Sequence, residues 1–142
     1  MSTSHFSGPV SSANGFVDTG TSTNTLGTVT ITGGLQQSFA NITAGTTQTQ
    51  GGATAITTDI VRVTTANASD GIILPALSAS QIGRTIRVIN ASANAGVIYC
   101  PGATSTNTIN GTAGATGVAY AASKMLTLVA VSATAWVSTL SN

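Results

Sequence analysis

Short runs in which apolar residues alternate with polar ones restrict the fold of this chain more than any other feature. In 59–65 and 84–90, valine or isoleucine recurs two residues apart, at 61 and 63 and at 86 and 88, which is the period of a β-strand with one buried face. No window keeps the three- and four-residue apolar spacing of a helix for long enough to form one. The sequence therefore predicts an all-β protein.

Six strands are expected from this pattern, and turn-forming residues separate them. They span Asp59–Thr65, Gly71–Leu74, Arg84–Asn90, Val97–Cys100, Lys124–Val131 and Ala135–Leu140. Asp70-Gly71, Asn94-Ala95-Gly96 and Asn110-Gly111 are typical of turns, and Ser132-Ala133-Thr134 is short enough to predict a hairpin between the last two strands. This arrangement favours an antiparallel β-sandwich, a jelly-roll-like fold or a barrel.

Residues 1–46 differ from the rest of the chain. They lack a sustained period, and we interpret them as an extended N-terminal arm that precedes a β-domain at 47–142. One short strand is expected within the arm, at Thr28–Thr32, because threonines there alternate with β-branched apolar residues. The arm also holds all three phenylalanines of the chain, which are Phe6, Phe16 and Phe39.

Charged residues are unusually scarce. They make up 5% of the 142 residues, glutamate is absent, the formal net charge is +1 and the mean hydropathy is +0.35, whereas about a quarter of an ordinary soluble protein is charged. Such a surface has little electrostatic protection against association. We therefore expect the chain to assemble with copies of itself or with a larger partner.

The same composition argues against several other partners. Nucleic-acid binding needs clustered basic residues, and this chain has four, Arg62, Arg84, Arg87 and Lys124. No apolar run is long enough for a membrane span. The start, Met1–Phe6, has no features of a secretory signal, so we expect the protein to be made in a cytoplasm.

Catalytic chemistry finds little support in the residues. His5 is the one histidine and lies next to the chain start, where a catalytic triad could not be held rigidly. The carboxylates are too few for a paired acid and base, and the glycine-rich stretch 111–117 has no lysine to bind phosphate. Cys100 is alone, so neither a disulfide within the chain nor a cysteine-based metal site can form. We expect no enzyme, cofactor or metal.

Several short motifs resemble known proteins. In the first half these are Ser4–Val10 and Asn14–Val17; in the second half they are Thr47–Ile56, Asp59–Thr65, Asp70–Ala76, Arg87–Asn90, Ile109–Gly111 and Trp136. The first set resembles the start of small head proteins of tailed bacteriophages. The second is similar to a β-domain of phage head-decoration (cement) proteins and of head or tail fibres. The chain departs from the pattern at Thr108, where an aspartate is common.

This resemblance implies a structural virion protein on the outer capsid surface, made in the host cytoplasm and bound to the major capsid protein as a homotrimer. The arm would anchor to the capsid through Phe6, Val10, Phe16, Val17 and Phe39, unless it folds back and buries them against its own domain. Candidate trimer contacts are Leu126, Leu128 and Trp136, which ordinary core packing would explain equally.

Two other functions stay open. The chain could be a head or tail fibre subunit for host attachment, which predicts few copies and an exposed tip. It could also be an ice-binding-like surface module, because threonines two residues apart occur in Thr28–Thr32 and Thr47–Thr49. No regular repeat supports the second alternative, and threonine is simply a good strand former.

Overall fold

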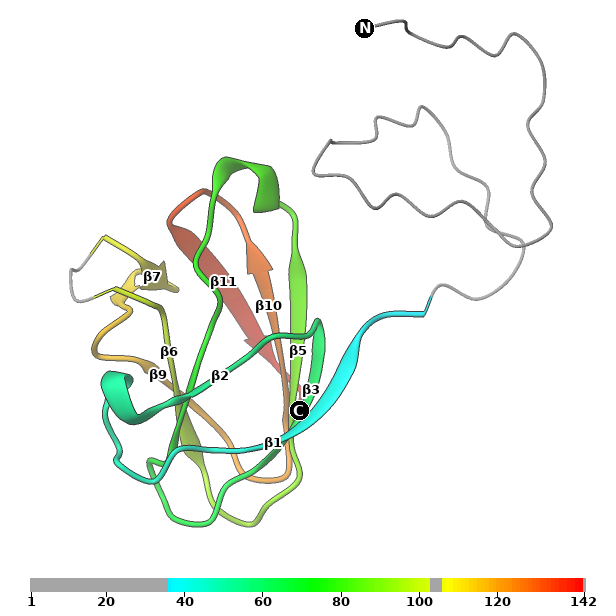
Figure 1. Ribbon diagram of the computed structural model, residues 1–142, viewed down its shortest axis with the longest axis vertical. Coiled ribbons are helices and arrows are strands. Elements are labelled where there is room, and N and C mark those ends of the chain that lie inside the picture. The colour runs from blue at the N-terminus through cyan, green and yellow to red at the C-terminus, as the bar shows by residue number, and fades with distance from the viewer. Residues whose placement is uncertain (1–35, 103–105, 142) are drawn as a thin grey trace, which may run out of the picture. The chain divides into compact units, whose positions relative to one another are not determined.

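A computed structural model describes residues 36–102 and 106–141, and these residues form two β-sheets (Figure 1). One sheet has seven strands in the order β1-β3-β5-β10-β11-β7-β8, and the other has four in the order β2-β4-β6-β9. The strands are β1 (Phe39–Thr43), β2 (Thr54–Ala55), β3 (Ile60–Thr64), β4 (Gly71–Ile73), β5 (Thr85–Asn90), β6 (Gly96–Tyr99), β7 (Thr108–Ile109), β8 (Thr112–Ala113), β9 (Val118–Tyr120), β10 (Met125–Ala130) and β11 (Ala135–Leu140). The all-β prediction is confirmed.

The prediction that the sheets are antiparallel is wrong for much of the domain. From β1 to β6 the chain alternates between the two sheets, so β1, β3 and β5 lie side by side in parallel, and so do β2, β4 and β6. Parallel neighbours need a crossover connection, and here a strand of the opposite sheet provides it. The winding therefore resembles the coils of a solenoid rather than a jelly roll.

The later strands are mainly antiparallel. β10 pairs with β11 as the predicted hairpin, with Ala130 opposite Trp136, and β10 also pairs with β5. A second small hairpin joins β7 and β8 through Asn110 and Gly111, whose φ angles are 51° and 79°. Positive φ at both central residues is typical of a tight hairpin turn and suits Asn-Gly.

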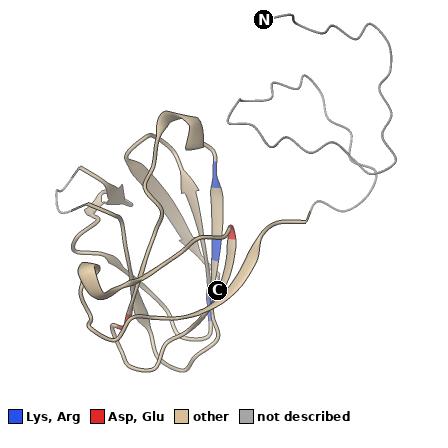
Figure 2. Cartoon of the chain, viewed as in Figure 1, with Lys and Arg blue, Asp and Glu red and all other residues tan. Residues whose placement is uncertain are grey.

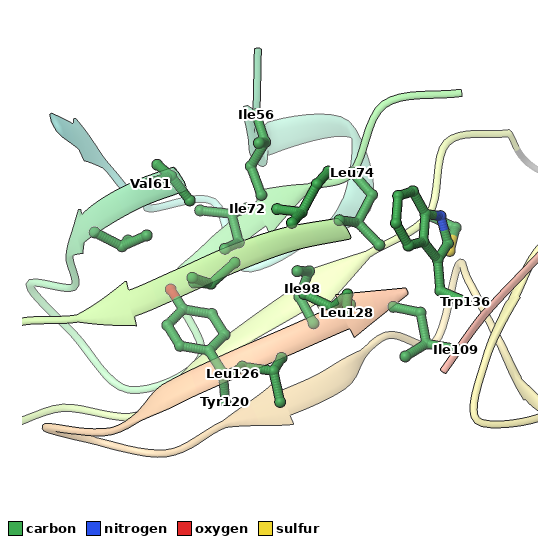
Figure 3. Close-up of a cluster of buried hydrophobic side chains, with 14 of the residues drawn as sticks. Ile56, Val61, Ile72, Leu74, Ile98, Ile109, Tyr120, Leu126, Leu128 and Trp136 are labelled. Atoms are coloured by element: carbon green, nitrogen blue, oxygen red, sulfur yellow. The ribbon is translucent and has the colours of Figure 1, made fainter. Parts of the chain in front are cut away.

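The core lies between the two sheets, where alternate side chains of each strand meet. Figure 3 shows Val61 and Leu128 of the seven-stranded sheet in one cluster with Ile72 and Ile98 of the four-stranded sheet, and all four are fully buried. Trp136 is the largest fully buried side chain. Two short 3-10 helices, η1 (Gln50–Gly52) and η2 (Ala79–Gln81), lie in connecting loops.

The compact unit begins earlier than the sequence predicted. It runs from Leu35 to Asn142, because β1 pairs with β3 along Phe39–Thr43. The boundary at 46 and 47 is therefore corrected, and Phe39 belongs to the domain rather than to the arm. The strand expected at Thr28–Thr32 lies outside the described residues. The turn expected at Asp70-Gly71 connects β3 to β4, which belong to different sheets, so it does not form a hairpin.

Candidate functional site

The outer face of the seven-stranded sheet presents an array of side chains from five adjacent strands. Period-two alternation buries one set of side chains in the core and turns the other set outward. We call the outward set on β1, β3, β5, β10 and β11 the open face. It consists of Phe39, Asn41, Thr43, Ile60, Arg62, Thr64, Thr85, Arg87, Ile89, Met125, Thr127, Val129, Ala135, Val137 and Thr139.

Strand register arranges these side chains in rows. One row crosses the sheet from Phe39 to Ile60, Arg87, Thr127 and Thr139, because each is the register partner of the next. Directly paired side chains on one face lie about 5 Å apart. The rows therefore form one continuous surface, although their residues come from distant parts of the chain.

Apolar side chains on the open face are exposed to an unusual degree. Phe39 is 54% exposed, Val137 45% and Met125 37%, while Ile60 and Ile89 between them are half-buried. Single exposed apolar residues need no explanation, but these three lie on the same face of one sheet. Because the face is built on paired strands, these side chains are held in place before any partner arrives.

The charge on this face has one sign. Arg62 and Arg87 are exposed there, and Nη1 of Arg87 donates a hydrogen bond to Oε1 of Gln37 at 3.0 Å. Asp59, at the border, forms a salt bridge with Arg84, with 3.1 Å between Nη2 and Oδ1. Figure 2 shows how few charged residues the described part carries. The open face is therefore weakly positive and contains no carboxylate.

The outer face of the four-stranded sheet is different, because loops of the chain cover its middle, while Ala55 and Ala119 on its edge strands stay exposed. Tyr99 points to this side yet is only 5% exposed, and its Oη donates to the carbonyl oxygen of Gln48 at 3.3 Å. Nε2 of Gln50 in η1 donates to the carbonyl oxygens of Cys100 and Gly102. We call this surface the covered face.

A second loop adds to this cover. Residues 114–117 pass so close to β6 that a Cβ added at Gly117 would collide with Val97 and Tyr99. Gly117 also has a φ of 73°, a conformation that glycine adopts without strain. The loop therefore needs glycine at this position.

The structure moves the predicted trimer contacts into the core. Leu126 is 4% exposed, Leu128 0% and Trp136 1%, so none of them can contact another subunit while the domain is folded. They are core residues, as the alternative interpretation held. Phe39 lies on the open face, and the other proposed anchors, Phe6, Val10, Phe16 and Val17, lie outside the described residues.

Two ionisable side chains among the described residues are shielded from solvent. Cys100 is fully buried, and burial raises the pKa of its thiol to about 11, so a nucleophilic thiolate does not form near neutral pH. Asp70 is also fully buried, with Oδ2 accepting from the backbone N–H of Asn67 at 2.9 Å. In the part of the chain that the structure describes, no three histidine, cysteine or acidic side chains gather as metal ligands.

Tyr120 belongs to a buried polar group that packs the domain. Its Oη lies 3.1 Å from Oγ1 of Thr65, and burial raises the pKa of its hydroxyl. Nδ2 of Asn90 donates to the carbonyl oxygens of Asn94 and Ala121 at 2.8 and 3.1 Å. These bonds tie the loops at one end of the two sheets together, so this group has a structural role.

Comparisons with known proteins give no relative. No family model, no curated protein and no solved structure matches the chain. Within residues 36–102 and 106–141, no helix has the length and apolar character needed to cross a membrane. The open face is therefore the feature from which a function can be argued.

Proposed function

We propose that the protein is a non-enzymatic structural virion protein that decorates a bacteriophage capsid. In this proposal the open face docks on the major capsid protein at the outer capsid surface, and the protein acts as a homotrimer without a cofactor. The observation that carries the proposal is the open face itself, on which exposed Phe39, Met125 and Val137 surround two arginines with no carboxylate. The short phage-like motifs in the sequence supply the class of partner.

The energetics suit many weak contacts rather than one tight one. Complete burial of a Phe, Met or Val side chain contributes about 1.5 to 3 kcal/mol, and these three side chains are already partly buried in the free domain. One face therefore gives modest affinity. Linking three copies multiplies it, because the second and third contacts become intramolecular.

The N-terminal segment adds further contacts in this proposal. Residues 1–35 precede β1 and could span about 120 Å if fully extended, which is enough to cross a neighbouring subunit. Phe6, Val10, Phe16 and Val17 remain the proposed anchors, because buried aromatic and aliphatic side chains commonly dominate such interfaces. Deleting residues 2–20 is expected to weaken binding to particles, and unchanged binding would contradict this role.

The trimer contact is assigned to a different exposed pair, now that Leu126, Leu128 and Trp136 belong to the core. Ile82 is 54% exposed and Val131 51%, and both lie at the end of the domain where the N–H of Gly83 donates to the carbonyl of Ala130 at 2.8 Å. Val131→Asp is expected to convert trimers to monomers without unfolding the domain. Size-exclusion chromatography with light scattering would measure this.

The proposal is tested with empty shells assembled from the major capsid protein of the same virus. Purified full-length protein is mixed with shells, the shells are sedimented, and the bound copies are counted by quantitative mass spectrometry. Decoration predicts saturation at many copies per shell, in multiples of three, whereas a fibre subunit predicts few copies. A monomer that stays in the supernatant at all concentrations would contradict the proposal.

A further inference from the structure

Two arginines stand next to each other on the open face. In the register of β3 and β5, Arg62 is the partner of Ile89, and Arg87 is the partner of Ile60. Each arginine is therefore the diagonal neighbour of the other across two parallel strands. From the strand spacing and the rise per residue, their Cα atoms lie about 8 Å apart.

Neither arginine has a carboxylate partner among the described residues. Of the two aspartates there, Asp59 is held by Arg84 and Asp70 is fully buried. Arg87 instead binds the neutral side-chain oxygen of Gln37, which orients the guanidinium without neutralising it. Like charges on neighbouring strands repel each other, and an anionic partner would relieve this repulsion.

We propose that Arg62 and Arg87 together bind a pair of carboxylates on an apolar surface of the partner protein. This inference rests on the proposed docking function and names the chemistry that the docking surface recognises. Guanidinium groups bind carboxylates through two parallel hydrogen bonds, so two arginines in fixed register set both the position and the orientation of the partner. The surrounding Phe39 and Met125 would exclude water from these pairs and strengthen them.

An acidic protein surface fits this site better than a nucleic acid does. Phosphate backbones are bound by extended basic surfaces, and the open face offers two cations among threonine and apolar side chains. The exposed side chains of Phe39, Met125 and Val137 would find no apolar complement on a phosphate backbone. A protein surface with carboxylates at the edge of an apolar patch complements both features.

The first test reverses the charge of each arginine in the full-length protein. R62E and R87E are expected to bind empty shells at least about tenfold more weakly than wild type, and the double variant at least about a hundredfold. Wild-type binding should weaken as sodium chloride is raised, because salt screens exposed charges, and it should not be competed by duplex DNA. K124E is the matched control, since Lys124 is exposed but outside the open face, and it should bind within about threefold of wild type.

The second test identifies the partner groups directly. R62K and R87K place an amine at each site, and a water-soluble carbodiimide then joins that amine to a carboxylate held beside it. An amide bond forms between Nζ and the carboxyl carbon, and the carboxyl oxygen leaves with the carbodiimide as a urea. Mass spectrometry should find cross-links from positions 62 and 87 to Asp or Glu of the capsid protein. A119K, on an exposed position of β9, is the control and should give none.

The outcomes separate this inference from the function on which it rests. Wild-type protein that does not bind shells overturns both. Shell binding that R62E and R87E leave within twofold of wild type, or cross-links equally frequent from A119K, overturns the arginine pair and leaves decoration standing. Competition by duplex DNA at stoichiometric concentration would show that the arginines recognise phosphate and would also overturn the carboxylate assignment. Thermal unfolding of each variant checks that the domain stays folded.

Discussion

The two outer faces of the domain contrast in what covers them. On the covered face, Tyr99 is 5% exposed, beside Gln48 and the loop at 114–117; on the open face, Phe39 is 54% exposed. Both are aromatic residues on paired strands, so the difference comes from the loops that each sheet receives. Within the described residues, loops shield the middle of one face, whereas apolar side chains of the other face stay exposed.

This difference suggests how a chain with so little charge can stay folded and still bind. The covered face stabilises the domain, because its side chains contact loops of the same chain. The open face contributes less to folding, since much of its apolar area remains in water. Stability and binding should therefore respond to substitutions on opposite sides of the domain.

The largest expected effect concerns Cys100, which lies beside the cover. We expect its labelling by an aromatic disulfide reagent at pH 8 to be about a thousandfold slower in the native protein than in denaturant. The thiol is fully buried with a pKa of about 11, so the reagent cannot reach the sulfur and little reactive thiolate is present. Absorbance of the released thiolate measures the rate, and comparable rates in the two states would show that the cover opens readily.

Removing the aromatic ring on the covered face should destabilise the domain strongly. Tyr99→Ala is expected to lower the free energy of unfolding by about 3 kcal/mol, because it leaves a cavity beside Gln48 and the loop at 114–117. Tyr99→Phe is the control and should cost less than about 1 kcal/mol, since it removes one long hydrogen bond. Urea denaturation measures both, and a Tyr99→Ala value within 1 kcal/mol of wild type would contradict the contrast between the faces.

The same burial predicts a loss of stability at alkaline pH. The pKa of Cys100 is raised from 9.0 to about 11 by folding, so the unfolded chain loses its thiol proton first as the pH rises. The contribution of this thiol to the free energy of unfolding is therefore fully present below pH 9, and about 2 kcal/mol is lost as the pH rises towards 11. Cys100→Ala should remove this part of the pH dependence, and an unchanged pH profile in that variant would assign the loss to other groups.

On the open face we expect the opposite, that a substitution weakens binding to shells more than it lowers the free energy of unfolding. Phe39→Ala is expected to change the free energy of unfolding by less than about 1 kcal/mol, because the side chain is more than half exposed. Its binding to shells should fall about tenfold, which corresponds to about 1.4 kcal/mol. Sedimentation measures binding, and Ala119→Ser on the other sheet serves as the control. A loss of stability larger than the loss of binding would argue that Phe39 is a folding residue.

The smallest effect is expected at the border of the open face. Asp59→Asn breaks the salt bridge to Arg84, whose side chains are 34% and 25% exposed, and exposed ion pairs contribute about 0 to 1 kcal/mol. We expect stability within 1 kcal/mol of wild type by thermal unfolding. The freed arginine would add a third unpaired cation beside the open face, so binding to shells should rise slightly rather than fall.

Much of the strand arrangement could be predicted from the sequence, because alternation reports a half-buried strand directly. All six expected strands are present with boundaries within about two residues, and the exposed positions of Arg62 and Arg87 follow from the same alternation. β1, β9 and the two-residue strands β2, β7 and β8 were missed, because they are too short or too weakly patterned to stand out.

The parallel winding could not be predicted from alternation, which says which face is buried but not which strand lies alongside. A weak signal did exist. The segments Ile60–Val63 and Ile86–Ile89 are similar in sequence. After each of them comes an apolar run that begins with glycine and is followed by proline: the first runs from Gly71 to Pro75 and the second from Gly96 to Pro101. Two such units in succession are what stacked coils of one winding would produce.

The composition of the open face was harder to predict for a related reason. In β10, apolar residues occupy both faces, so the sequence alone does not say whether Leu126 and Leu128 or Met125 and Val129 point to the core. The pairing of Leu128 with Ile86 of β5 decides it. Only the assembled sheet then brings Phe39 into the same surface as Met125.

Hydroxyl-radical footprinting of the protein free in solution and bound to shells tests most directly whether the open face is the contact surface. Phe39 and Met125 are both exposed and both readily oxidised, and peptide mass spectrometry reports each one separately. We expect oxidation of both to fall severalfold on binding, while oxidation at Ile82 and Val131, at the end of the domain, changes less. Bound protein in which Phe39 and Met125 are oxidised as fast as in free protein would contradict the proposal.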